Sequence, residues 1–119
     1  MTPTIYPRSE SGLLPSDSYN QGLLGDVEFL TIHHSAGPRA STKALAQGLH
    51  RAYKRDHVAK GWGDICYHWS MDDLGRFYEL RPQEAKGTHV GGCNSNNVGL
   101  MLHGNYEHHE LTGEQKTSL

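Results

Sequence analysis

The stretch Thr31-Ile32-His33-His34-Ser35-Ala36 constrains this chain more than any other. Residues 27–32 are rich in β-branched and aromatic side chains, which predicts a short buried strand, and Gly37-Pro38 then ends it. Two polar side chains therefore stand where a core strand finishes. Because successive strand residues point to opposite faces, only one of His33 and His34 can reach a given metal ion or substrate atom. That residue is a functional ligand, or else it simply ends the strand with a hydrogen bond to the backbone.

The composition limits the chain to one small domain. It has 119 residues, of which 35% are hydrophobic, and this is enough for a single modest core. The net charge of −2 provides no general attraction to nucleic acid or to anionic membranes. Nine histidines are more than average composition predicts, and imidazole is a common zinc ligand and the usual acid or base near neutral pH. The composition therefore favours a metal or acid-base site.

The first 25 residues predict an irregular N-terminal arm, and residues 26–119 predict one domain. The arm contains three prolines and scattered serines, and its two Leu-Leu pairs are the places where it would pack on the domain. Its apolar runs are too short for a secretory signal or a membrane span, so cytoplasmic synthesis without a signal peptide is expected. Cys66 and Cys93 could form one disulfide, but two free thiols are the expected state.

A helix is expected after the loop that follows the histidine pair. Ser41 or Thr42 can cap its first turn, and Gly61 would stop it. The apolar stripe of this helix would consist of Leu45, Leu49, Ala52 and Tyr53. In the simplest interpretation, His57 lies near the helix end as an imidazolium that interacts favourably with the helix dipole.

Later segments predict a sheet with a loop beside it. Residues 65–71 alternate in polarity and predict a strand with one apolar face, and residues 76–80 predict its hairpin partner. Residues 98–102 predict another strand, which ends at His103. Between them, residues 87–97 are rich in glycine and asparagine and predict a long surface loop of the kind that contacts ligands. Two strands that end in histidine favour a shared polar site at one edge of a sheet.

The last residues predict the start of a helix. Thr112 and Gln115 have the spacing of a capping box, yet Leu119 follows after barely two turns. A helix of this length cannot cover the face of a sheet. We therefore expect that a C-terminal part is missing from the sequence, or that a partner chain supplies it.

Four motifs together resemble one enzyme superfamily. They are, in order, Ile32–Gly37, Gly61–His68, Gly87–His89 with Asn94–Leu100, and Gly104–Tyr106. This series resembles the type 2 N-acetylmuramoyl-L-alanine amidases, which include short phage endolysins and the peptidoglycan recognition proteins. The resemblance implies an α/β fold with a mixed central β-sheet flanked by helices. It also implies a zinc ion in a cleft and cleavage of peptidoglycan between N-acetylmuramic acid and the L-alanine of the stem peptide.

The resemblance assigns roles to particular residues. His33 matches the first zinc ligand, and Tyr67 matches a tyrosine beside the zinc, whose phenol can hydrogen-bond the developing oxyanion or the attacking water. In the other interpretation, Tyr67 is one more ring on the apolar strand face. His34 faces the other way along its strand and is included as a substrate-binding candidate. The remaining positions that match the substrate groove are His57, Trp62, His68, His89, Asn94 and Asn97.

Two departures from the family pattern leave alternatives open. The second histidine ligand and the cysteine or aspartate ligand of relatives lie beyond the helix that Thr112 begins, and so beyond Leu119. Met101 stands where an intracellular recycling branch has a catalytic glutamate, which favours the endolysin and recognition-protein branch. The chain could also be a peptidoglycan-binding module without zinc, or His103, His108 or His109 could complete a different metal site. In the leading interpretation it acts on the cell wall after phage-type release or export by an unknown route.

Overall fold

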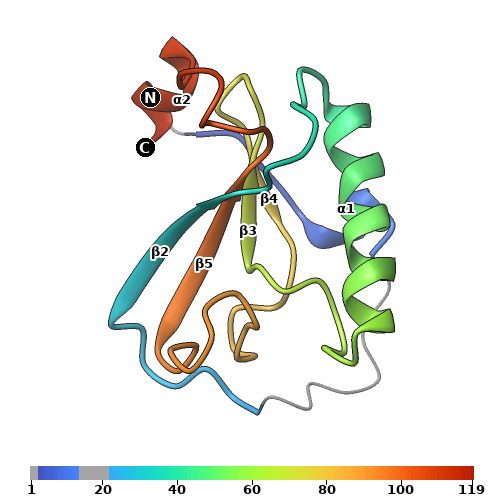
Figure 1. Ribbon diagram of the computed structural model, residues 1–119, viewed down its shortest axis with the longest axis vertical. Coiled ribbons are helices and arrows are strands. Elements are labelled where there is room, and N and C mark those ends of the chain that lie inside the picture. The colour runs from blue at the N-terminus through green and yellow to red at the C-terminus, as the bar shows by residue number, and fades with distance from the viewer. Residues whose placement is uncertain (1–2, 14–21) are drawn as a thin grey trace.

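A five-stranded mixed β-sheet organises the chain, in the order β1-β4-β3-β5-β2 (Figure 1). The computed structural model describes residues 3–13 and 22–119. Its elements are β1 (Ile5–Tyr6), the 3-10 helix η1 (Arg8–Ser11), β2 (Phe29–His34), α1 (Lys43–Ala59), β3 (Trp69–Met71), β4 (Phe77–Glu79), β5 (Asn97–Leu102) and α2 (Gly113–Ser118). β3 and β4 are antiparallel, whereas the other neighbouring strands are parallel. The prediction of an α/β fold with a mixed central sheet is confirmed.

β2 lies at the edge of the sheet, although the sequence predicted a buried strand. It starts at Phe29, includes both histidines and pairs with β5 along one side. Among the described residues, no strand pairs with its other side. Phe29, Leu30 and Ile32 are 61%, 59% and 53% exposed. The β-branched and aromatic composition predicted the strand, but the burial of its side chains depends on what packs over the two faces of the sheet, which composition cannot reveal.

The N-terminal segment is more ordered than the irregular arm that was predicted. β1 pairs in parallel with β4, and the ring of Tyr6 lies 5.1 Å from that of Tyr78. Leu13 and Leu24 are buried, whereas Leu23 is 79% exposed, and Leu14 lies outside the described residues. Residues 3–13 therefore belong to the same sheet and core as the rest. A two-residue strand has no periodicity to detect, and it forms here because β4 offers a free edge.

α1 covers one face of the sheet (Figure 1). As predicted, the side chain of Thr42 caps it by accepting a hydrogen bond from the amide of Leu45, at 3.1 Å. Its buried side differs from the predicted stripe, because Ala46 and His50 are fully buried while Leu45 is 51% exposed. None of the helices in the described parts of the chain is long and apolar enough to cross a membrane.

β3 covers only Trp69–Met71 of the predicted residues 65–71. It has the predicted apolar face, but its polar face is buried as well. Ser70 points under α1, where its hydroxyl lies 2.6 Å from Nε2 of His50. Met71 points to the opposite face and packs with Leu100 and Leu102. The polar face of β3, at Ser70, is thus buried against His50, a polar residue of α1. The predicted hairpin to β4 and the predicted strand β5 are both confirmed.

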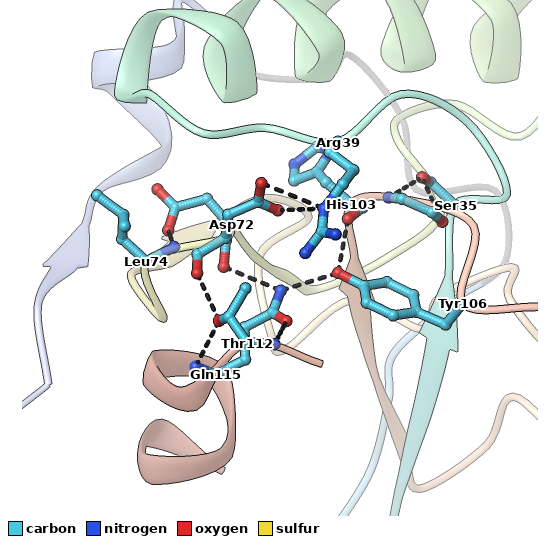
Figure 2. Close-up of polar contacts among 10 residues, drawn as sticks. Ser35, Arg39, Asp72, Leu74, His103, Tyr106, Thr112 and Gln115 are labelled. Atoms are coloured by element: carbon cyan, nitrogen blue, oxygen red, sulfur yellow. Dashed lines mark hydrogen bonds and ion pairs between the residues drawn. The ribbon is translucent and has the colours of Figure 1, made fainter. Parts of the chain in front are cut away.

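α2 is held by the hydrogen bonds drawn in Figure 2. The capping box predicted from Thr112 and Gln115 is present. The hydroxyl of Thr112 also donates to the carbonyl of Asp73, at 2.6 Å. The buried amide of Gln115 donates to the hydroxyl of Tyr106, which in turn donates to the carbonyl of His103. These bonds fix α2 against the β3–β4 turn and the end of β5.

Candidate active site

His33 and His34 face opposite sides of β2. The ring of His33 lies 5.3 Å from that of Tyr67 and 5.1 Å from that of His89. His34 contacts Tyr106 instead, and its Nδ1 accepts a hydrogen bond from the Tyr106 amide, at 3.1 Å. The structure therefore separates the two histidines, as the alternation of strand faces predicted. His34 does not share a site with His33, and this argues against its assignment to the same substrate groove.

Four of the predicted site residues lie together between β2 and the C-terminal end of α1. The ring of Tyr67 is near both His33 and His57, and the ring of His57 lies 5.0 Å from that of Trp62. These residues come from three separate segments of the chain. The sheet register and the packing of α1 bring them into one row of rings.

His57 is a neutral hydrogen-bonding residue and not the imidazolium that the helix dipole suggested. Its Nδ1 accepts a hydrogen bond from the backbone amide of Cys66, at 3.1 Å. Burial, followed by the charge of Lys60, lowers the pKa of His57 to about 4. A neutral ring whose Nδ1 is an acceptor carries its proton on Nε2. His57 therefore anchors the segment before Tyr67 and keeps one N–H for a ligand.

Tyr67 keeps its proton at neutral pH. Burial raises the pKa of Tyr67 above its usual value, and the neighbouring Cys66 raises it further. Cys66 and Cys93 are both free thiols, and burial raises the pKa of Cys66 to about 12. A protonated phenol beside His33 can donate a hydrogen bond to a carbonyl oxygen or to an oxyanion.

His89 and His68 use their ring nitrogens inside the protein. His89 contacts His33 through Nδ1, at 3.0 Å, and the carbonyl of Asn97 through Nε2, at 2.9 Å. His68 is 1% exposed; its Nδ1 accepts from the amide of Gly99, and its Nε2 donates to the carbonyl of Ala85. Both were predicted to bind substrate. His68 has no ring nitrogen left for a ligand. Both ring nitrogens of His89 are also engaged, one by His33 and the other by the Asn97 carbonyl.

Asn94 and Asn97 hold the 87–97 loop in place through hydrogen bonds inside the protein. Oδ1 of Asn94 accepts hydrogen bonds from the backbone amides of His89 and Val90. Asn97 is 5% exposed, donates to the carbonyl of Cys93 and accepts from the hydroxyl of Thr31. Both amide atoms of Asn97 are used inside the protein, which argues against its predicted contact with substrate. Only Oδ1 of Asn94 is used in this way, and its role in binding substrate stays a prediction. Polar side chains in a glycine-rich loop suggested ligand contacts, but here they satisfy the loop's own backbone.

Arg81 is a functional support that the sequence analysis missed. Its guanidinium is fully buried and donates to the carbonyls of Trp62, Ile65 and Lys86. These bonds join the segment that carries Trp62 and Tyr67 to the start of the 87–97 loop. The sequence contains no signal for this role, because an arginine at the end of a strand next to proline is typical of a surface position.

The described residues do not by themselves form a zinc site. They contain no group of three or more His, Cys, Asp or Glu side chains that could hold a metal. A hydrolytic zinc site takes about three protein ligands, and His33 would supply one. The alternative site gains no support, because His103 is fully buried with its Nε2 3.0 Å from Nε2 of His50, and no third ligand joins them in the described part of the chain.

Comparison with known proteins shows which family has this architecture. The family model for N-acetylmuramoyl-L-alanine amidase matches residues 23–119. The chain belongs to this family. It is 34% identical over 119 residues to peptidoglycan-recognition protein SC2 of Drosophila melanogaster, covering 97% of this chain and 62% of that protein. It is 31% identical over 107 residues to the N-acetylmuramoyl-L-alanine amidase of Homo sapiens, covering 87% of this chain and 19% of that enzyme.

Solved structures of recognition proteins share the fold of this family member. Drosophila peptidoglycan recognition protein SD aligns with a TM-score of 0.88 and 22% identity, over 98% of this chain and 70% of that one. Peptidoglycan recognition protein LE, solved in complex with tracheal cytotoxin, aligns with a TM-score of 0.88 and 25% identity, over 97% of this chain and 68% of that one. The chain spans about three fifths of the length of the recognition protein SC2 that it matches.

Proposed function

We propose that this chain carries the substrate site of a zinc-dependent amidase that cleaves the bond between N-acetylmuramic acid and L-alanine in cell-wall peptidoglycan. One observation supports this most directly. His33 has a ring nitrogen, Nδ1, that makes no hydrogen bond within the described residues, and its ring lies 5.3 Å from the ring of a protonated Tyr67. The family model for N-acetylmuramoyl-L-alanine amidase covers the whole of this region.

The residues of the site suit an amide substrate. Tyr67 would donate a hydrogen bond to the scissile carbonyl oxygen, an interaction that strengthens as negative charge develops there. Nε2–H of His57 and the half-buried ring of Trp62 would contact the stem peptide beside it. Zinc, when bound, polarises the carbonyl and lowers the pKa of its water. His33 would be one of its ligands, and the others are not among the residues described.

The same three residues, Tyr67, His57 and Trp62, also favour a second function. Because the described residues offer no three-ligand metal group, the site is equally suited to bind a muramyl peptide without cleaving it. The matched solved structures include recognition proteins in complex with tracheal cytotoxin or with a glycosamyl muramyl pentapeptide. Binding would use Tyr67, His57 and Trp62, and it would be independent of zinc.

One experiment separates the two functions. The protein that contains this chain is assayed at its natural length for release of stem peptide from purified peptidoglycan, with added Zn²⁺ and with a chelator. Binding of a muramyl tripeptide is measured alongside by calorimetry. We expect zinc-dependent release that His33→Ala abolishes and His34→Ala retains, because these neighbours face opposite sides of β2. Binding without release in all conditions would assign the recognition function, and absence of both would refute the site.

A further inference from the structure

The contacts of His89 determine which of its ring nitrogens carries a proton. Nε2 lies 2.9 Å from the backbone carbonyl oxygen of Asn97. A carbonyl oxygen can only accept, so Nε2 must donate. A neutral imidazole has one N–H, and Nδ1 of His89 is therefore an acceptor.

This assignment extends to His33. Nδ1 of His89 lies 3.0 Å from Nε2 of His33, and a hydrogen bond between two nitrogens needs one proton between them. Since His89 accepts, His33 must donate through Nε2. The proton of a neutral His33 is then on Nε2, and Nδ1 is left with a free lone pair. Nδ1 makes no hydrogen bond to any of the described residues.

Contacts with neighbouring residues fix the position of the His89 ring. A Cβ atom at Gly87 or at Gly99 would lie only 2.7 Å from the His89 ring, so both positions have room for it only as glycine. Asn94 holds the His89 backbone through two hydrogen bonds from neighbouring amides. The ring of His68 packs edge-on to it, at 5.8 Å and 82°. The ring is therefore fixed by several independent contacts and not by one rotamer preference.

We propose that His89 is a positioning residue that holds His33 in its Nε2–H form, so that Nδ1 of His33 is the atom presented to the site. The chain of hydrogen bonds runs from the Asn97 carbonyl through His89 to His33. Its purpose is to orient a ligating or accepting histidine from behind, as second-sphere partners of such residues do. The inference rests on the proposed function only for the identity of what binds Nδ1.

Two conservative variants separate this role from simple packing. In His89→Asn, the amide oxygen can occupy the place of Nδ1 and accept from His33, while the bond to Asn97 is lost. In His89→Gln, the longer side chain can replace Nε2 and keep the bond to Asn97, while His33 loses its acceptor. Packing alone predicts similar behaviour for the two.

The readout is the tautomer of His33, measured by ¹⁵N NMR on histidine-labelled protein free of metal and of peptidoglycan. We expect a single Nε2–H form of His33 in the wild type and in His89→Asn, and a mixture of both tautomers in His89→Gln. If either variant unfolds, the wild-type spectrum alone still decides the direction of the bond. An Nδ1–H form of His33, a doubly protonated His89, or the same mixture in every protein would overturn the proposal. Because no ligand is added, its failure is distinct from failure of the amidase assignment.

Discussion

Mild acid should destabilise this protein through histidines that are buried in the neutral form. His50, His68 and His103 are all at most 1% exposed. Burial lowers the pKa of His50 to about 2 and that of His68 and His103 to about 4, from a reference value of 6.5. In the unfolded chain these rings take up protons below pH 6.5, while in the folded protein they stay neutral down to about pH 4. The unfolded state therefore binds more protons in this window, and stability falls as the pH falls.

The size of the effect follows from the width of that window. At pH 5, each ring with a reference pKa of 6.5 stabilises the unfolded state by about 2 kcal/mol, since one pKa unit corresponds to about 1.4 kcal/mol. The summed destabilisation from the three rings is comparable to the lower end of the total stability of a small domain, about 5 kcal/mol. We therefore expect cooperative unfolding near pH 5, and a nearly flat stability above pH 7 as far as these groups are concerned.

The assay is urea unfolding followed by tryptophan fluorescence at several pH values between 7 and 5. In His103→Gln, the amide can replace Nε2 beside His50, and the slope of unfolding free energy against pH should fall by about 1.4 kcal/mol per unit. His108→Asn, at an exposed position, is the matched control and should keep the wild-type slope. A stability that does not change from pH 7 to pH 5, or a wild-type slope in His103→Gln, would refute the reasoning.

Three further substitutions test the site and its supports. Tyr67→Phe should lower stem-peptide release about 10²-fold without changing the urea midpoint, and unchanged turnover would limit Tyr67 to packing. Asn97→Ala removes two hydrogen bonds of a buried amide and should cost about 1–3 kcal/mol in urea unfolding; a loss below 0.5 kcal/mol would contradict the geometry. In Gly99→Ala the added Cβ atom would lie 2.7 Å from the His89 ring, and the free energy of unfolding should fall by about 1–3 kcal/mol. Gly91→Ala is the control, because its added Cβ atom would have open space around it and should leave the stability unchanged.

Local sequence determined the elements whose hydrogen bonds close within a few residues. The cap at Thr42, the capping box of Thr112 and Gln115, and the hairpin between β3 and β4 were all predictable, because each depends on residues at most ten positions apart. The ordered series of four motifs also identified the family and its mixed sheet. The separation of His33 from His34 followed from the two-residue period of a strand alone.

Tertiary structure decided what each side chain does. His33 meets His89 across 56 residues of sequence, and the amide of Gly99 meets His68 across 31. The second contact turned His68 from a predicted ligand-binding residue into an internal support, and the sheet order placed β2 at an edge. A sequence pattern records which groups can donate or accept. Whether such a group faces a ligand depends on whether folding brings it a partner from elsewhere in the chain, because a buried polar group is stable only when its hydrogen bonds are satisfied.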